Sequence, residues 1–283
     1  MVVIRSVFEM QREAERLRGP GRTIGLVPTM GYLHAGHESL IAEARRSCDV
    51  VVLSIFVNPT QFAPSEDFAR YPRDFERDTA VAQKAGVDIV FAPESKEMYP
   101  DAYSTYVGEV EASGILEGQF RPTHFRGVTT VVAKLLNICK PHIAVFGQKD
   151  AQQAYIIGRM VRDLNIDVTI VVAPIVREPD GLAMSSRNVY LSAEDRRNAT
   201  VLYESLKFAE REVRGGERSA ATIRTAMETM IRSKGSPRID YIAFLDPDKF
   251  REIDTLNGTA VLIALAVRFG NTRLIDNVVV TTK

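Results

Sequence analysis

Short apolar runs recur along the first part of the chain, and segments with helical periodicity separate them. The runs are rich in β-branched residues, which favours buried strands over 23–27, 49–57, 87–91, 142–146 and 168–172. Apolar positions three and four residues apart predict helices over 6–18, 36–47, 74–85, 129–139 and 151–164, the first opened by a Ser6/Glu9 capping box. This alternation predicts a parallel sheet with helices on both faces, a doubly wound, Rossmann-like α/β domain.

The pattern changes after about residue 174. Residues 178–181 end in Asp-Gly, which favours a tight hairpin turn. Helical patterns follow over 192–214 and 219–233, and strand-like stretches over 239–245, 260–267 and 274–280. Helices followed by strands are typical of a smaller α+β domain. We therefore predict domains over 1–176 and 177–283, with the cleft between them as the natural ligand site.

Composition narrows the class of protein. The chain has 283 residues, of which 45% are hydrophobic and 25% charged, so disorder and fibrous structure are excluded. Its 36 basic residues balance 36 acidic ones, which leaves no net charge to attract nucleic acid or an anionic membrane. No apolar run approaches the roughly 20 residues of a membrane span, and residues 1–10 lack a signal-peptide core. We expect a cytoplasmic protein with two isolated, reduced cysteines.

Two of the four histidines, His34 and His37, lie where the first predicted strand runs into the next predicted helix. Side chains three residues apart share a helix face, and free N–H groups and the positive helix end suit a phosphate. Gly31 and Gly36 let the backbone approach a ligand closely. The alternative interpretation, polar surface histidines, is less favoured by the strand–loop–helix context. No third metal-ligand residue lies nearby, and the sequence has neither a P-loop nor a Gly-x-Gly-x-x-Gly turn. These observations argue against a metal site, a P-loop enzyme and a dinucleotide-dependent dehydrogenase.

Polar residues also follow the second and fourth predicted strands. Asn58 and Gln61 come after the second strand, and Lys149 comes after the fourth, next to Gly147. The carboxyl ends of parallel strands bind ligands, which carboxamides and a lysine can hold. Capping of the next turn is an equally good interpretation for the carboxamides, and a solvated side chain is the alternative for Lys149. Two polar strand ends on one rim favour a functional role for Lys149.

A loop of hydroxyl and basic residues, Met-Ser-Ser-Arg-Asn at 184–188, lies near the predicted domain junction. An Arg fork with serine hydroxyls can hold a polyphosphate. The motif alone is weak, because Ser-Ser-Arg is common in loops. Its position near the junction is what makes it a candidate.

Together these segments resemble the pantoate–β-alanine ligase family of coenzyme A biosynthesis, within the His-x-Gly-His nucleotidylyltransferases. The matching segments follow the family's order and cover essentially the whole chain, at 27–37, 56–62, 71–74, 124–128, 146–150, 184–188 and 270–277. The resemblance implies that the carboxylate of pantoate attacks the α-phosphorus of Mg²⁺-bound ATP, which gives pantoyl adenylate and pyrophosphate. The amine of β-alanine then displaces AMP to give pantothenate. A homodimer is also implied.

The resemblance also implies roles for single residues. His34, His37 and Lys149 would be catalytic, with His37 as proton donor. Gln61 and Gln153 would bind pantoate, and Gln61 also β-alanine. Asp78 aligns with a stretch implicated in Mg²⁺ binding, although a solvent-facing helical carboxylate is the favoured alternative. ATP would be bound by Met30, Gly31, Tyr32, Leu33, His34, Ala35, Gly36, His37, Gly147, Gln148, Lys149, Asp150, Val176, Met184, Ser185, Ser186 and Arg187.

An acyl adenylate must be kept from water. We expect the C-terminal domain to close over ATP, and composition suggests a lid over 117–127, bounded by Gly114 and Gly127. Two other functions stay open. Another His-x-Gly-His nucleotidylyltransferase would predict a basic groove or an anticodon-binding extension. A non-catalytic nucleotide-binding regulator would need neither both carboxamides nor Lys149.

Overall fold

The computed structural model of the chain describes residues 1–19, 21–63, 67–258 and 260–282. The chain divides into two compact units, each described by itself. The N-terminal unit comprises Met1–Gly147 and Gln152–Pro174. The C-terminal unit comprises Ile175–Lys283 and also the short segment Gln148–Ala151.

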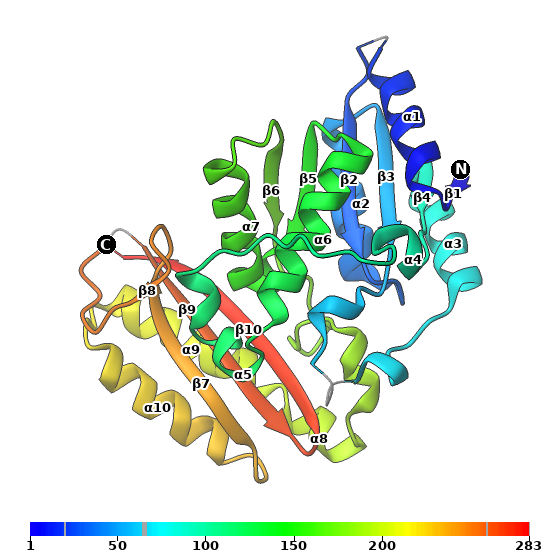
Figure 1. The fold of residues 1–283 in the computed structure, drawn as a ribbon. Helices are drawn as coiled ribbons and strands as arrows, with labels where there is room; N and C mark the ends of the chain where they lie inside the picture. Colours follow the sequence, from blue (N-terminus) through cyan, green and yellow to red (C-terminus); the bar gives the residue numbers. More distant parts are fainter. Residues whose placement is uncertain (20, 64–66, 259, 283) are drawn as a thin grey trace. The chain divides into compact units, whose positions relative to one another are not determined.

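The N-terminal unit is built on a six-stranded parallel sheet with the order β1-β4-β3-β2-β5-β6 (Figure 1). The predicted doubly wound α/β fold is therefore confirmed. Among the described strands of this sheet, the pattern missed β1, because three residues are too few to show a period, and it also missed the short helices α4 and α5. The strands are β1 (Val2–Ile4), β2 (Ile24–Thr29), β3 (Val50–Ile55), β4 (Ile89–Phe91), β5 (Ile143–Gly147) and β6 (Thr169–Ala173).

Helices connect these strands, and two of them begin at side-chain caps, of which Ser6 was expected. Ser6 accepts the N–H of Glu9 at the start of α1, and Asp74 accepts that of Arg77 at the start of α3. Helix α6 begins at His124 rather than at the predicted residue 129. Gly127 therefore lies inside its first turn. The helices are α1 (Val7–Arg18), α2 (Ala35–Ser47), α3 (Phe75–Lys84), α4 (Ser95–Met98), α5 (Glu117–Phe120), α6 (His124–Cys139) and α7 (Ala151–Asp163).

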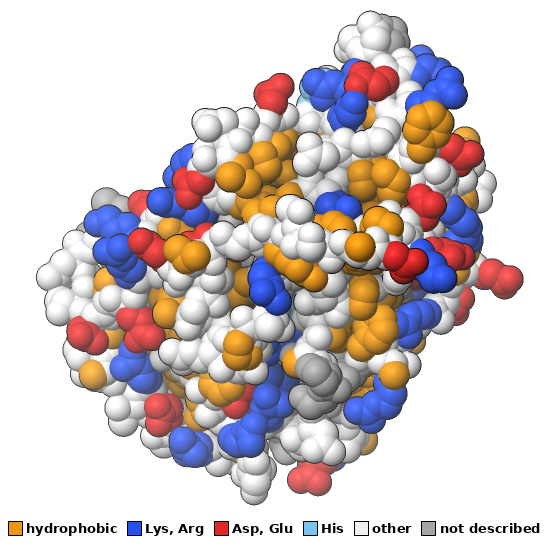
Figure 2. Space-filling view, in the orientation of Figure 1, with side chains coloured by type: hydrophobic (Ala, Val, Ile, Leu, Met, Phe, Trp, Pro, Cys, Tyr) orange, Lys and Arg blue, Asp and Glu red, His pale blue; other side chains and the backbone are white. Residues whose placement is uncertain are grey.

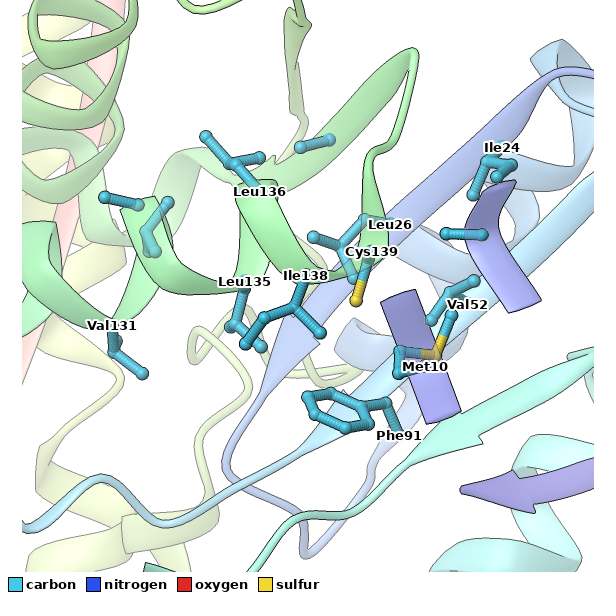
Figure 3. Close-up of a cluster of buried hydrophobic side chains, with 14 of the residues drawn as sticks. Met10, Ile24, Leu26, Val52, Phe91, Val131, Leu135, Leu136, Ile138 and Cys139 are labelled. Atoms are coloured by element: carbon cyan, nitrogen blue, oxygen red, sulfur yellow. The ribbon is translucent and has the colours of Figure 1, made fainter. Parts of the chain in front are cut away.

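Both faces of this sheet are buried, because successive strand residues point to opposite sides. Leu26 and Val52 face a core completed by α1, α6 and α7, where Met10 of α1 packs (Figure 3). Val27 and Val51, one residue away along each strand, face a second core completed by α2 and α3. With both faces covered, a ligand can approach the sheet only at the strand ends.

The C-terminal unit is an antiparallel sheet with the order β10-β9-β7-β8, and α9 and α10 pack against it. The single helix expected over 192–214 is interrupted near Ala199, and α9 ends at Gly215, followed by the cap residue Gly216 with a φ of 105°. An antiparallel bridge between Arg177 and Ala183 confirms the expected hairpin turn. The elements are α8 (Ala193–Asn198), α9 (Val201–Gly215), α10 (Ala220–Arg232), β7 (Arg238–Asp246), β8 (Arg251–Glu252), β9 (Ala260–Phe269) and β10 (Thr272–Thr281).

Figure 2 shows basic and acidic side chains spread over the visible face of both units, in keeping with the balanced charge. Within the described residues, no helix combines the length and apolarity needed to cross a membrane.

Candidate active site

The strand order of the N-terminal sheet reverses between β2 and β5. From β2 the chain proceeds to β3 and β4 on one side, whereas β5 and β6 lie on the other. Ligands of open α/β sheets bind beyond the carboxyl ends of the strands at such a switch point. Strand β2 ends at Thr29, directly before the His-x-Gly-His segment, and β5 ends at Gly147. Two of the predicted functional segments therefore border the switch point.

His34 and His37 form a reciprocal cap at the start of α2. His34 Nδ1 accepts the N–H of Gly36 at 3.1 Å, and His37 Nδ1 accepts the N–H of His34 at 3.3 Å. The ring centroids are 4.1 Å apart. A ring nitrogen that accepts an N–H carries no proton, so each neutral imidazole carries its proton on Nε2. The cap thus sets both histidines as Nε2–H donors on one helix end.

The backbone N–H groups of this segment are largely used inside the protein, which corrects the expectation that they are free for phosphate. The N–H of Gly31 donates to Thr29 Oγ1 at 3.2 Å, and those of Tyr32 and Leu33 donate to Asp78. The N–H of Gly36 donates to His34, as described above. An anion at this helix end would therefore be met mainly by the imidazole rings.

Asp78 is buried, with 1% exposure, so the solvent-facing alternative is wrong. Its Oδ2 accepts the N–H of Tyr32 and its Oδ1 that of Leu33, each at 2.7 Å. Among the described residues, no group of three or more His, Cys, Asp or Glu is placed to hold a metal ion. The carboxylate of Asp78 is thus part of the support of the histidine loop.

Gln61 and Asn58 lie together after β3, are bonded to each other, and differ in their further partners. Asn58 Nδ2 donates to Gln61 Oε1 and to the Gly127 carbonyl, each at 3.1 Å, and its Oδ1 accepts the Tyr99 hydroxyl at 2.8 Å. Burial raises the pKa of Tyr99 to about 12, so this hydroxyl remains a donor. Gln61 Nε2 lies 3.2 Å from Met30 Sδ. Asn58 is therefore a structural anchor, while Gln61 lies beside the histidine segment.

Gln153 is half-buried on α7, and its neighbour Gln152 anchors the segment expected to be a lid. Gln152 Nε2 donates to the carbonyls of Ala112 and Ile115 at 2.7 and 2.8 Å, and its Oε1 accepts the N–H of Glu117 at 3.1 Å. These bonds tie 112–117 to α7.

Close packing also explains two glycines of this segment. A Cβ on Gly118 would lie 1.8 Å from the Ser113 carbonyl oxygen, and one on Gly127 would lie 2.4 Å from the Thr60 oxygen. Both glycines are required by contact with backbone. Of the two glycines that bound the expected lid, Gly127 is thus required by packing, whereas a Cβ on Gly114 would meet nothing within 4 Å.

In the C-terminal unit, Lys149 lies in a single 3₁₀ turn, Gln148–Asp150, held by Asn277 of β10. Asn277 Nδ2 donates to the carbonyls of Gln148 and Lys149 at 2.9 and 3.0 Å, and its Oδ1 accepts Gln148 Nε2 at 2.9 Å. The carboxamide of Gln148, predicted to bind ATP, is thus bonded to Asn277. The side chain of Lys149 is half-buried and that of Asp150 is exposed.

A buried ion pair fixes the hairpin of Val176 and Met184. Arg177 donates to both oxygens of Asp276, at 2.6 and 2.9 Å, and to the Gly181 carbonyl at 3.1 Å. Burial raises the pKa of Asp276, while Arg177 lowers it. The Met184 N–H donates to the Val176 carbonyl at 3.0 Å. The carboxylate and its arginine therefore set this turn.

The hydroxyl-basic loop follows directly. Ser185 Oγ accepts the N–H of Arg187 at 3.2 Å and caps a 3₁₀ turn over Ser186–Tyr190. The side chains of Ser185, Ser186 and Arg187 are half-buried. Each unit therefore gathers its own share of the predicted site residues: 30–37, Gln61, Gly147 and Gln153 in one, and 148–150, Val176 and 184–187 in the other.

Sequence reasoning missed the anchoring roles of Asp78, Gln152, Arg177, Asp276 and Asn277. Except for the Gly181 carbonyl, four positions from Arg177, the partners described above lie 35 to 129 positions away in the chain, which local patterns do not reveal. The signals came from the family resemblance, which placed Asp78 in a stretch implicated in Mg²⁺ binding and included 270–277, to which no role was attached.

Comparisons with known proteins agree over nearly the full length. A family model described as pantoate-β-alanine ligase matches residues 2–279. Proteins named pantothenate synthetase from Acetivibrio thermocellus and Thermotoga petrophila are 54% and 53% identical, each over 99% of both chains.

Two solved structures are similar as well. Pantothenate synthetase from Thermus thermophilus matches with a TM-score of 0.92 at 46% identity, covering 98% of this chain and 99% of that one. Pantoate-β-alanine ligase from Francisella tularensis, complexed with β-γ ATP and β-alanine, matches with a TM-score of 0.80 at 35% identity, covering 98% and 97%. This chain belongs to the pantoate–β-alanine ligase family.

Proposed function

We propose that this chain condenses pantoate with β-alanine to pantothenate through a pantoyl-adenylate intermediate, consuming ATP and releasing AMP and pyrophosphate. The observation that carries the proposal is the reciprocal cap of His34 and His37 beside the switch point of the sheet. Membership of the ligase family, matched over residues 2–279, supports it.

In the first step, the pantoate carboxylate attacks the α-phosphorus while the bond to pyrophosphate breaks. Negative charge builds up on the leaving pyrophosphate, and donors already in place stabilise it without reorganisation. The Nε2–H groups of His34 and His37 fill this role in our proposal, with His37 as the proton donor. Lys149 and Arg187 add positive charge, the arginine through a fork that matches phosphate. The remaining predicted ATP residues line the nucleotide.

Mg²⁺ enters this proposal as part of the substrate, bound to the phosphates of ATP. There it would neutralise charge on the leaving group. Among the described residues no cluster of carboxylates and histidines offers it a protein site. We therefore assign the metal no protein ligand.

Gln61 and Gln153 hold pantoate in this scheme, since carboxamides serve hydroxyls and carboxylates with donor and acceptor atoms alike. Gln61 also contacts β-alanine. The second step needs no enzyme nucleophile, because the adenylate is already activated. It needs water to be kept away. Closure of the C-terminal domain over ATP, a cytoplasmic location and a homodimer complete the proposal. Closure rests on the need to exclude water, the location on the sequence pattern, and the homodimer on the family resemblance.

Two assays test the reaction. ATP–pyrophosphate isotope exchange should require pantoate but not β-alanine, because only the adenylation step is involved. Net AMP release should require both acids and match the pantothenate formed. Exchange that ignores pantoate, or no AMP release with all substrates present, would overturn the proposed function.

A further inference from the structure

We propose that Asp78 is a positioning residue that holds the loop before α2 in the shape that His34 and His37 require, and that it is not a Mg²⁺ ligand. The inference rests on the proposed function, because it concerns the adenylation step. It departs from the metal role that the family resemblance implied for this carboxylate.

The loop that Asp78 holds has an unfavourable backbone conformation. Gly31 and Tyr32 have φ values of 82° and 50°, two consecutive residues in the left-handed region. A tyrosine adopts this region only when its surroundings impose it. In this conformation the N–H groups of Tyr32 and Leu33 both donate to the carboxylate of Asp78 at 2.7 Å. Asp78 therefore occupies, as an internal anion, the concave N–H arrangement that an external anion would otherwise fill.

Arg77, the neighbour of Asp78 on α3, holds the same loop from the other side. Its Nη2 donates to the Leu33 carbonyl at 2.9 Å, and its guanidinium lies over the Tyr32 ring at 5.1 Å. Helix α3 thus binds both the N–H and the carbonyl of Leu33. The next residue is His34, the cap of α2. The direction in which α2 begins therefore depends on these two hydrogen bonds to Leu33.

The surroundings of Asp78 do not fit a Mg²⁺ ion. Each carboxylate oxygen already accepts an N–H, and Arg77 Nη1 lies 3.7 Å from Oδ1, which places a positive charge beside any cation. The backbone of Gly31 crowds Oδ2, since a Cβ there would lie 2.8 Å away. Mg²⁺ needs octahedral coordination and keeps several waters, whereas this side chain is 2% exposed.

The Asp78→Asn variant separates positioning from metal binding. It keeps the side-chain volume but removes the charge and one acceptor oxygen. We expect the maximal rate of ATP–pyrophosphate exchange to fall about tenfold to a hundredfold, the scale for a misplaced catalytic group. The Mg²⁺ concentration giving half-maximal rate should not change. A raised Mg²⁺ requirement, with the rate restored at high Mg²⁺ or Mn²⁺, would overturn the proposal.

A double-mutant comparison tests whether Asp78 acts through the histidines. In a His37→Ala background, Asp78→Asn should cost much less than it does in the wild type, because the group being positioned is gone. Equal fold losses in the two backgrounds would show a general structural effect and overturn the positioning role. Failure of pantoate-dependent exchange in the wild-type protein would instead refute the proposed function.

Two further variants control for folding. Asp74→Asn alters the exposed cap of the same helix but keeps an oxygen that can accept the N–H of Arg77, and should leave the exchange rate unchanged. If Asp78→Asn does not fold, Arg77→Met removes the hydrogen bond to the Leu33 carbonyl without burying a polar group. It should lower the exchange rate with an unchanged Mg²⁺ requirement, and an unchanged rate would count against the proposal.

Discussion

At the scale of single residues, His34 and His37 each use one ring nitrogen to cap α2 and keep the other as a donor. In our proposal, two tasks that are usually separate, helix capping and phosphate binding, are joined in the same side chains. The capping task fixes the tautomer needed for the second task. Removing an imidazole should consequently affect both stability and rate.

We expect His37→Ala and His37→Gln to differ in stability but not in rate. Both remove a charge stabiliser, which should lower pyrophosphate exchange about 10²-fold or more. Glutamine at this third helical position can still accept the N–H of His34, as in a capping box, whereas alanine cannot. Urea unfolding should therefore show a loss of about 1 kcal/mol for alanine and little for glutamine. Intact exchange in either folded variant would contradict the catalytic role.

At the scale of elements, backbone contacts decide where the carboxamide of Gln61 lies. The turn that carries Gln61 packs against Gly127 in the first turn of α6, so closely that a Cβ there would lie 2.6 Å from the Gln61 nitrogen. Asn58 adds a hydrogen bond to the Gly127 carbonyl. The position of Gln61 thus depends on α6 as well as on β3.

Gly127→Ala should displace this turn. The added Cβ should destabilise the protein by about 1–3 kcal/mol, as overpacking does, and raise the KM for pantoate more than that for ATP. Gly158→Ala on α7 is the matched control, since its Cβ would meet nothing within 4 Å. That variant should be slightly stabilised with unchanged kinetics. Equal KM values for pantoate in the two variants would contradict this role of the turn.

The elements themselves could be predicted largely from the sequence. The runs near β2, β3 and β5 and the cap of α1 at Ser6 were found because periodicity and capping are local properties. The start of α6 was placed too late, because residues 117–127 were expected to form a lid bounded by Gly127, and the backbone partner of Gly127 was unknown. Errors arose where a contact from far along the chain determined the local structure.

At the scale of the whole molecule, the chain passes between its two units more than once. It leaves the N-terminal unit after Gly147, adds Gln148–Ala151 to the C-terminal unit, returns for α7 and leaves again after Pro174. Asn277 of β10 holds the segment Gln148–Ala151 by hydrogen bonds to the carbonyls of Gln148 and Lys149. Lys149 is therefore held by the C-terminal unit.

We expect Asn277→Leu to lower pyrophosphate exchange about tenfold, because it keeps the branched shape of the side chain but removes the hydrogen bonds that hold the Lys149 turn. Lys149→Ala should cost about 10²-fold. The double variant should be no slower than Lys149→Ala alone, since Asn277 acts through the lysine. Val279→Ala, at an exposed position of the same strand, is the control and should match the wild type. Losses that multiply in the double variant would contradict this coupling.

The sequence by itself determined the α/β class, most elements, the family and the candidate residues. Hydrophobic period, turn chemistry and motif order all depend on residues that are close together in the chain. The tertiary structure alone decided what Asp78, Gln152 and Asn277 do, since their partners are 35 to 129 positions away. It also decided that the N–H groups around Gly31 are already occupied. A buried polar group must find its partners wherever the fold brings them, and folding brings together groups that are distant in the chain.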